Sequence, residues 1–255
     1  MILSFPFLTA SFDADARAYI NTSGATDRAA INHFVKAVKR LGLWSSMVCW
    51  PLRSTQNAGT GSTAYSLGGL GTYNGTLVNG PTWGADGVTG VSTSSAITTS
   101  LALTTGNASR SIFGVWKNLS AAQFNPVGTT APGAERLVLR SNSQTTASAD
   151  LYNGTIYDNF GQVTVPSGIN FSALSYNSST SGIIFKANSN TASTLTLSKN
   201  FTSSNLILGG YSGPGQGLGV FSMAAAFDLF TLSETQIDDL RNLYKSTLGQ
   251  GLGLP

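Results

Sequence analysis

The end of the chain joins an apolar run to an amphipathic segment. Residues 224–230 (AAAFDLF) are almost continuously apolar, which predicts a strand buried on both faces. Ser233 follows as the N-cap of a helix, and Gln236 stands at the position of its reciprocal partner in a capping box. This helix is expected to end at Gly249. Its spacing gives one apolar face, made of Leu232, Ile237, Leu240, Leu243 and Tyr244.

Two further helices are predicted near the start of the chain. Asp13 is the expected N-cap of a short first helix, and Gly24 ends it. Thr26 is expected to cap a second helix that ends at Gly42. Because His33 leans to the polar side of this second helix, we expect it to be exposed. Apolar residues recur there at three- and four-residue spacing and form one face: Ile31, Phe34, Val35, Val38 and Leu41.

The middle of the chain has a different pattern, in which short apolar or alternating runs are separated by Gly, Asn, Ser and Pro. Runs at roughly ten-residue spacing with little helix between them are typical of an antiparallel β-sandwich. The predicted strands are AYSL, GTLVNG, VTGVST, RSIFGVWKNL, ERLVLRSN, ADLYNG, INFSALSYNS, SGIIFKANS, STLTLS, NLILGGY and FSMAAAFDLF. The sequence therefore predicts an N-terminal arm and helical segment over residues 1–54 and a β-sandwich with a C-terminal covering helix over residues 55–255.

The first residues form an apolar arm. The stretch MILSFPFL is broken by Pro6 and has no basic region before it, so it matches a signal peptide poorly. We expect residues 1–12 to pack onto their own domain or a neighbouring subunit. No later stretch approaches the ~20 apolar residues that a transmembrane helix needs, so a membrane is not an expected partner.

Composition narrows the class of partner. Charged residues make up 10% of the chain, compared with about 25% in an average soluble domain. Ser, Thr, Asn and Gly take their place, which predicts a polar but nearly neutral surface. The net charge is +3, and the Lys and Arg residues are scattered without a basic run. Nucleic acid is therefore excluded as a partner, because its binding needs a basic patch.

The chain has one cysteine and one histidine. A single cysteine excludes an intramolecular disulfide, and these two residues cannot supply the usual ligand set of a zinc site. Cys49 lies among apolar residues in MVCWPL, which predicts a buried and inert thiol. A Ser-His-Asp triad would depend on His33, which lies on a predicted helix. We expect no metal and no other cofactor.

Carboxylates do not form an obvious catalytic pair. Glycoside hydrolases hold two carboxylates about 5–9.5 Å apart, and the two glutamates of this chain, Glu135 and Glu234, lie in different predicted elements. Glu234, Asp238 and Asp239 fall in the first two turns of the last helix, where the helix dipole favours negative charge. These acids therefore have a structural explanation without catalysis.

Asp150 and Asp158 flank the hairpin sequence LYNGTIY. They could pair with each other or bind Ca²⁺, but turn formation by Asn-Gly already explains the pattern. We therefore expect no enzymatic activity.

Aromatic residues in or beside predicted loops are the candidate ligand contacts: Tyr152, Tyr157, Phe160, Tyr176 and Tyr211. Lectin sites place aromatic faces beside Asn, Asp and backbone donors. Packing in the core or at its rim would explain each residue singly. As a group they suggest a glycan or receptor site, for which Tyr152, Tyr157 and Tyr211 are the candidates.

Two segments carry a resemblance to known domains. YNGTLVNGPTWGADGVTGVS, residues 73–92, resembles the early part of laminin-G or concanavalin A-like jelly-roll domains. FDLFTLSETQIDDLRNLY resembles the strand and covering helix that close them, about 150 residues later. The resemblance covers roughly residues 65–248 and implies a concanavalin A-like jelly roll.

A second resemblance concerns the helical segment. DADARAYINTSGATDRAAINHFVKAVKRLGLWSSMVCWPL is similar to a segment that precedes β-rich domains in virion proteins of tailed bacteriophages, and it keeps the AYIN, AINHFV and GLWSSM elements. It departs from them at VCWPLRSTQNAGTGSTAYSL. This resemblance implies a location in the virion but does not separate head from tail.

Three functions follow as hypotheses. The first is a non-enzymatic virion structural protein, in a head decoration or a tail or fibre, that contacts other virion proteins and forms a homo-oligomer. The second is a lectin-like tail appendage that binds a host receptor or surface glycan. The third, least favoured by the residues, is a glycan hydrolase.

Overall fold

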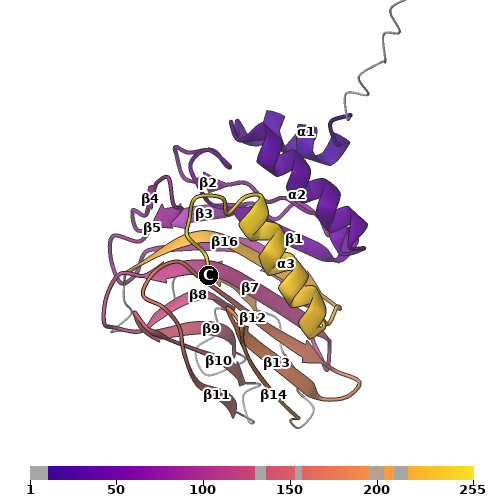
Figure 1. Cartoon of the computed structure of the whole chain (residues 1–255), viewed down its shortest axis with the longest axis vertical. Coiled ribbons are helices and arrows are strands. Elements are labelled where there is room, and N and C mark those ends of the chain that lie inside the picture. Colours follow the sequence, from indigo (N-terminus) through magenta and orange to yellow (C-terminus); the bar gives the residue numbers. More distant parts are fainter. Residues whose placement is uncertain are drawn as a thin grey trace, which may run out of the picture.

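Two antiparallel β-sheets face each other, and helices cover the outer side of one of them (Figure 1). A computed structural model describes residues 11–129, 136–152, 157–195, 199, 201, 204–209 and 218–255; the side chains of residues 136, 157–161 and 193–195 also lie outside this description. This arrangement confirms the predicted class, a mainly β, antiparallel jelly-roll sandwich with an N-terminal helical segment and a C-terminal covering helix.

Among the described residues, each sheet has eight strands. The first sheet has the order β14 (Asn190–Leu195), β13 (Gly182–Ala187), β12 (Asn170–Asn177), β7 (Arg110–Asn118), β16 (Gly219–Asp228), β5 (Val88–Thr89) and β4 (Thr82–Trp83), and β1 (Met47–Pro51) also pairs with β16. The second sheet has the order β11 (Tyr157–Thr164), β10 (Thr146–Tyr152), β9 (Arg136–Ser143), β8 (Phe124–Thr129), β15 (Asn205–Leu208), β6 (Ala96–Ala102), β3 (Gly75–Val78) and β2 (Thr63–Ala64). The helices are α1 (Ala14–Ser23), α2 (Arg28–Arg40), the short 3₁₀ helix η1 (Trp44–Ser46) and α3 (Glu234–Ser246).

The first sheet is buried on both faces. Along β7, Ile112 and Trp116 point into the core between the sheets, and Phe113 and Val115 point into a second core beneath the helices. This alternation follows from the two-residue period of a strand. A strand buried on both faces reads as a continuous apolar run, and β16 is fully buried from residue 219 to residue 227.

Most predicted strands are present, but β1, β4, β6, β8 and β11 were not predicted. β1 is a five-residue run that is buried throughout, and it pairs with β16 from Met47↔Phe227 to Pro51↔Met223. β8 contains Pro126, a residue that argues against a strand when sequence is read alone. β6 alternates buried and exposed residues for most of its length. The alternation is hard to recognise in the sequence, because Thr and Ser occupy both buried and exposed positions.

The first two helices correct the predicted details. Asp13 caps α1 as expected by accepting from the Asp15 N–H, and Gly24 ends the helix in the left-handed conformation with φ 73°. The N-cap of α2 is Asp27, so the prediction of Thr26 was wrong. The Thr26 backbone N–H instead donates to the Thr55 carbonyl at 2.8 Å.

The apolar face of α2 is also shorter than predicted. Leu41 lies beyond the end of the helix and is 36% exposed, whereas the other four residues of the predicted stripe are buried.

The C-terminal unit follows the prediction closely. Both hydrogen bonds of the capping box are present: the Gln236 N–H donates to the Ser233 hydroxyl, and the Ser233 N–H donates to the Gln236 side chain. The helix ends at Ser246, before the expected Gly249. Ile237, Leu240 and Tyr244 pack into the core beneath the helices.

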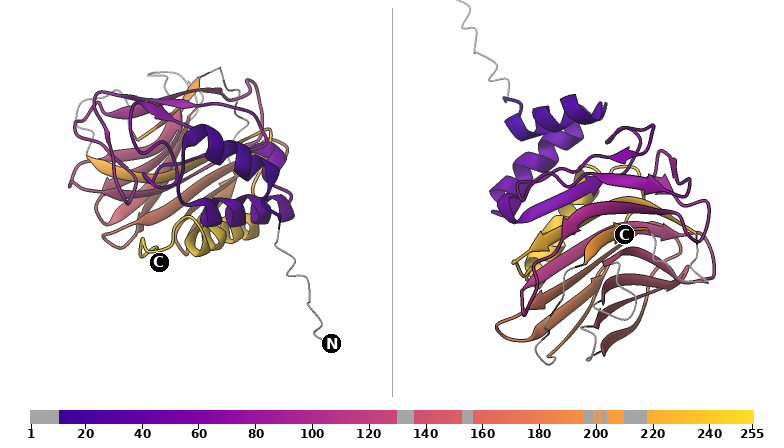
Figure 2. Two further views of the ribbon diagram at one scale, coloured as in Figure 1. Left: turned by 90° about the horizontal axis from the view of Figure 1, so that it is seen from above. Right: turned by 180° about the vertical axis from the view of Figure 1, so that it is seen from behind.

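Segments on both sides of residue 55 share that core. The helical segment contributes α1 and α2, and β1 within it belongs to the first sheet, so the helices and the sandwich are packed together (Figure 2). The arm that was expected to dock lies in residues 1–12, of which residues 1–10 fall outside the described residues. Phe12 is half-buried against the helical core, and the Arg28 guanidinium lies 5.9 Å from the centre of its ring.

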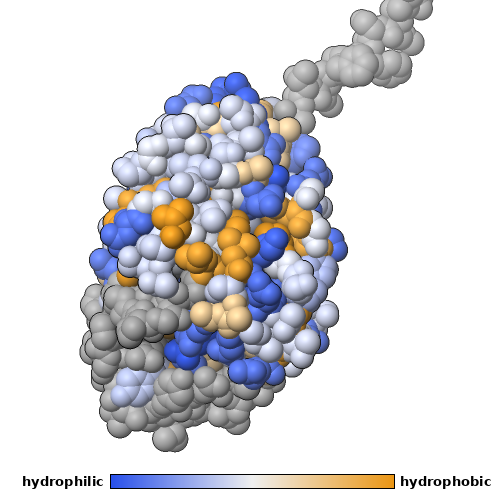
Figure 3. Space-filling view, turned by 90° about the vertical axis from the view of Figure 1, so that its left-hand side faces the viewer, coloured by the Kyte–Doolittle hydropathy of each residue, from blue (hydrophilic) through white to orange (hydrophobic). Residues whose placement is uncertain are grey.

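On the face drawn in Figure 3, residues of intermediate hydropathy are interspersed with apolar and strongly polar residues. In the described part of the chain the exposed large apolar residues are Leu41, Val91, Leu119 and Leu229. None of the helices in the described ranges combines the length and the apolar character needed to span a membrane.

Candidate functional site

Two of the three tyrosines proposed from the sequence, Tyr152 and Tyr157, lie in the β10–β11 hairpin at one edge of the second sheet. Tyr152 ends β10, is half-buried, and stands opposite Tyr157 of the edge strand β11. The side chains of Tyr157 and Phe160 and the whole of Tyr211 lie outside the described residues. Tyr176 is a core residue whose hydroxyl donates to Asn107 Oδ1 at 2.6 Å.

Two of the acids considered as a catalytic or Ca²⁺ site, Asp150 and Glu234, have structural partners, and the side chain of Asp158 lies outside the described residues. Asp150 is fully buried in β10 and forms an ion pair with Arg140 of β9, so it is not a turn residue. Asp158 stands opposite Leu151 in the β10–β11 register. Glu234 binds Lys186 and the Thr191 hydroxyl, and Glu135 lies outside the described residues. Within the described ranges, no three His, Cys, Asp or Glu side chains gather as metal ligands would.

The structure confirms the predicted burial of Cys49 and the predicted exposure of His33. Cys49 is buried beneath the helices, where burial raises the pKa of its thiol well above the ordinary value. His33 is exposed on α2.

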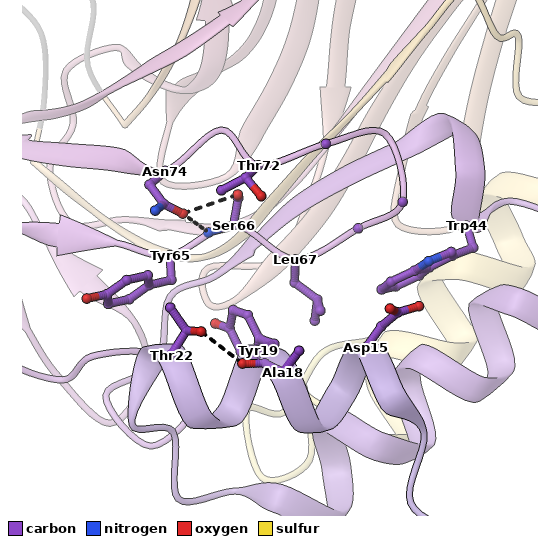
Figure 4. Close-up of a pocket in the computed structure, with 13 residues that line it drawn as sticks. Asp15, Ala18, Tyr19, Thr22, Trp44, Tyr65, Ser66, Leu67, Thr72 and Asn74 are labelled. Carbon is purple, nitrogen blue, oxygen red and sulfur yellow. Dashed lines mark hydrogen bonds between the residues drawn. The ribbon is translucent and has the colours of Figure 1, made fainter.

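A pocket of about 390 Å³ lies between α1 and residues 65–74, the segment that joins β2 to β3 (Figure 4). From α1 it is lined by Asp15, Ala18, Tyr19 and Thr22, whose spacing places them on one face of the helix. Trp44 of η1 stands at one end of the pocket and Tyr65 at the other. Its size falls within the range of about 300–1,000 Å³ for small-molecule sites.

The floor of the pocket is rigidly held. Tyr19 is 6% exposed, and its hydroxyl donates to the Gln56 carbonyl at 2.7 Å. Burial raises the pKa of this hydroxyl well above its ordinary value, so it stays protonated. Leu67 exchanges two backbone hydrogen bonds of 2.7 Å with Cys49, which fix the loop to β1.

Glycines let the loop approach the helical segment closely. Gly68 has φ +152°, and a Cβ at this position would overlap the Met47 carbonyl oxygen. A Cβ on Gly69 would lie 2.7 Å from Cδ1 of Trp44. The Gly69 N–H also donates to the Trp44 carbonyl at 3.0 Å. The wall of the pocket beside Trp44 is therefore backbone that only glycine can supply.

Polar groups of residues 66–74 form the rim. Asn74 Oδ1 accepts from the Ser66 N–H at 2.9 Å and from its hydroxyl at 3.3 Å, and the Ser66 hydroxyl accepts from the Tyr73 N–H. These bonds orient the Asn74 amide and leave its Nδ2 donor without a partner in the described part of the chain. The hydroxyls of Thr72 and Tyr65 also have no hydrogen-bond partner among the described residues.

Asp15 brings a carboxylate to the end of the pocket beside Trp44 (Figure 4). Lys39 Nζ lies 2.7 Å from Asp15 Oδ2, 2.8 Å from Asp13 Oδ1 and 5.2 Å from the centre of the Trp44 ring. Partial burial opposes the charge of Lys39, but the two carboxylates outweigh it and raise the pKa of the amine. Partial burial also opposes the charge of Asp13, but its bonds with Lys39 and two backbone N–H groups lower its pKa.

This pocket was not predicted from the sequence, because its walls come from three segments that pair only in the folded chain. The local signal was the stretch YSLGGLGTYN, residues 65–74, in which three glycines stand between two tyrosines. The arrangement offers aromatic surface at two ends and amide, hydroxyl and carboxylate groups along its sides.

Comparisons with known proteins show the fold. No model of a known protein family matches the sequence, and no curated protein matches it. A Trypanosoma rangeli sialidase mutant displaying trans-sialidase activity matches with a TM-score of 0.57 and 11% identity, over 88% of this chain and 38% of that chain. Unmutated Trypanosoma rangeli sialidase matches with a TM-score of 0.55 and 11% identity, over 87% of this chain and 39% of that one.

A shorter match is the CBM40 domain of the Ruminococcus gnavus IT-sialidase bound to α2,6 sialyllactose. Its TM-score is 0.45 and its identity 16%, over 52% of this chain and 82% of that chain. The match to the leech intramolecular trans-sialidase has a TM-score of 0.44 and 15% identity and covers 53% of this chain and 23% of the enzyme. The chain thus spans well under half the length of the whole sialidases it matches.

Proposed function

We propose that this chain is a carbohydrate-binding β-sandwich, and that its ligand occupies the pocket between α1 and residues 65–74. The observation that carries the proposal is the meeting of Trp44 and Tyr65 with Asn74, Thr72 and Asp15 in one pocket. Aromatic rings pack against the apolar C–H faces of a sugar, and amide, hydroxyl and carboxylate groups bond its hydroxyls. The proposal places the ligand at the helix–sandwich junction, whereas the sequence suggests Tyr152, Tyr157 and Tyr211 as the contacts.

We propose that the pocket binds a glycan and does not cleave it. Hydrolysis of a glycosidic bond generally requires a pair of carboxyl groups on opposite sides of that bond. Asp15 is the one carboxylate among the residues that line the pocket, and it is engaged with Lys39. Incubation of the protein with any glycan that it binds should therefore leave the glycan intact when followed by mass spectrometry.

The test compares two half-buried tyrosines at the two candidate sites. After a glycan array identifies a ligand, Tyr65→Ala should weaken its binding by at least about tenfold, which corresponds to about 1.4 kcal/mol. Tyr152→Ala at the edge of the second sheet is the matched control and should leave binding unchanged. Thr72→Ala, a change at an exposed position, should weaken binding without disturbing the fold.

Two results would reject the pocket as the glycan site. One is an array that gives no signal with the wild-type protein. The other is a loss of binding with Tyr152→Ala and not with Tyr65→Ala, which would move the site to the edge predicted from the sequence. Circular dichroism and the thermal midpoint should show that each variant is folded.

The resemblance of residues 13–52 to phage virion proteins supports a proposal for the setting, namely a virion in which this chain contacts other virion proteins and copies of itself. A glycan-binding pocket would suit the lectin-like tail appendage better than a purely structural subunit. Immunogold labelling of intact particles, with sedimentation of the purified chain for its oligomeric state, tests that setting independently of the pocket.

A further inference from the structure

The pocket has an unusual charge content. Asp15 is the sole charged residue among those that line it, and none of the lining residues is a Lys, Arg or His. Its other polar side chains, among them Thr22, Ser66, Thr72, Asn74 and Tyr65, are neutral donors and acceptors. A ligand in the pocket therefore meets one fixed negative charge and no free positive one from the lining residues.

Lys39, the cation beside Asp15, is already paired with two carboxylates. Lys39 Nζ is held between Asp13 Oδ1 at 2.8 Å and Asp15 Oδ2 at 2.7 Å, and it also contacts Asp13 Oδ2 at 2.9 Å. Two carboxylates and one ammonium group leave this cluster with a net charge of −1 at neutral pH. An anionic ligand could use Lys39 only by displacing one of these carboxylates from it.

We infer that the pocket selects uncharged saccharides and rejects sugars that carry a carboxylate, such as sialic and uronic acids. This inference rests on the proposed carbohydrate binding. Vicinal hydroxyls of a neutral sugar can donate to the Asp15 carboxylate, and such charge-assisted hydrogen bonds are the strong ones. An acidic sugar in the same place brings a like charge against Asp15, and the repulsion is stronger in a partly enclosed pocket than in water.

The selectivity is measured on an array of paired glycans, in which each neutral glycan is printed beside its sialylated or uronic-acid counterpart. The expected result is binding of neutral glycans and at least about fivefold weaker binding of the acidic partner of each. Titration calorimetry then gives the affinity ratio for the strongest pair. Raising the salt concentration should reduce the ratio, because salt screens the repulsion between charges that remain partly solvated.

Asp15→Asn locates the origin of the selectivity. Removing this charge should raise the affinity for the acidic glycan at least about fivefold relative to its neutral partner. Asp239→Asn is the matched control, since Asp239 is exposed on α3 away from the pocket, and it should leave the ratio unchanged.

The failures of the two proposals are distinguishable. Equal or stronger binding of acidic glycans by the wild-type protein would overturn the selectivity while leaving carbohydrate binding in place. An unchanged ratio in Asp15→Asn would overturn it as well. Absence of binding to both members of every pair would remove the carbohydrate-binding function, and the selectivity with it.

Discussion

Lys186 Nζ lies 2.7 Å from Asp238 Oδ2, so an ion pair ties β13 of the first sheet to α3. The same amine lies 3.1 Å from Glu234, whose carboxylate also accepts a 2.7 Å hydrogen bond from Thr191 on β14. The Lys186 side chain is 4% exposed. Two of the three acids near the start of α3, Glu234 and Asp238, therefore also attach the helix to the sheet.

Removing one partner of this pair should destabilise the protein. Asp238→Asn leaves a buried ammonium group with a weaker partner, and we expect it to lower the free energy of unfolding by about 1–2 kcal/mol. Lys186→Met removes the buried charge but keeps an apolar side chain, so its cost should be smaller. Urea unfolding measures both, with the exposed Asp239→Asn as control. A larger loss for Lys186→Met than for Asp238→Asn would contradict this account.

Acid should weaken the attachment of α3. The Thr191 hydroxyl and then Lys186 lower the pKa of Glu234 below its ordinary value of 4.5. A carboxyl group with a lowered folded-state pKa stabilises the fold above the unfolded-state value, and this contribution is lost as the pH falls through the folded-state pKa. The free energy of unfolding should therefore decrease as the pH falls below about 4.5.

Glu234→Gln tests the assignment of that pH dependence. Between pH 5 and pH 3, the free energy of unfolding should decrease less in the variant than in the wild-type protein, as measured by urea titrations at each pH. The decrease that remains in the variant comes from other carboxyl groups, among them Asp13. An unchanged slope would show that Glu234 does not contribute.

Gly68 should not tolerate a side chain. It combines φ +152° with contact between its missing Cβ and the Met47 carbonyl, whereas Gly61 has φ +70° and open space around it. Gly68→Ala should cost more than about 2 kcal/mol and abolish ligand binding, because the pocket wall must shift. Gly61→Ala should cost about 1 kcal/mol, the strain of the left-handed conformation alone. Equal costs in thermal or urea unfolding would argue against the close packing of this loop.

The buried thiol should be protected from reagents. Cys49 is fully buried and its pKa is raised by that burial, so little thiolate is present or accessible. Its reaction with Ellman's reagent at pH 8 should be at least about a hundredfold slower in the native protein than in urea, since only unfolded molecules expose it. Rapid reaction of the native protein would contradict the described packing of β1.

Local signals allowed much of the fold to be predicted. The cap at Asp13, the Gly24 end of α1 and the Ser233–Gln236 capping box depend on neighbouring residues, and these interactions are encoded within a few positions. The cap of α2 was assigned wrongly at a place where the backbone N–H groups of Thr26 and Asp27 both donate to the carbonyl of Thr55, a residue that lies far along the chain. Long-range partners of this kind have no signature in a local pattern.

The candidate site could not be predicted for a similar reason. Asp15, Trp44 and Asn74 come from three separate segments, and their meeting depends on the pairing of Leu67 with Cys49. The loop aromatic residues chosen instead were defined by sequence position alone. Of these, Tyr176 proved to be core, because a residue at the end of a strand can still point inward.

The place of β16 in the first sheet bears on how the chain is made. This strand, residues 219–228, pairs with β7 along one side and with β1 and β5 along the other. The ribosome delivers β1 and β7 before their common partner β16, so the edges that pair with it stay open until residues 219–228 have been synthesised. Completion of the first sheet is therefore a long-range event, and a nascent chain that ends before residue 219 should be more aggregation-prone than one that includes β16.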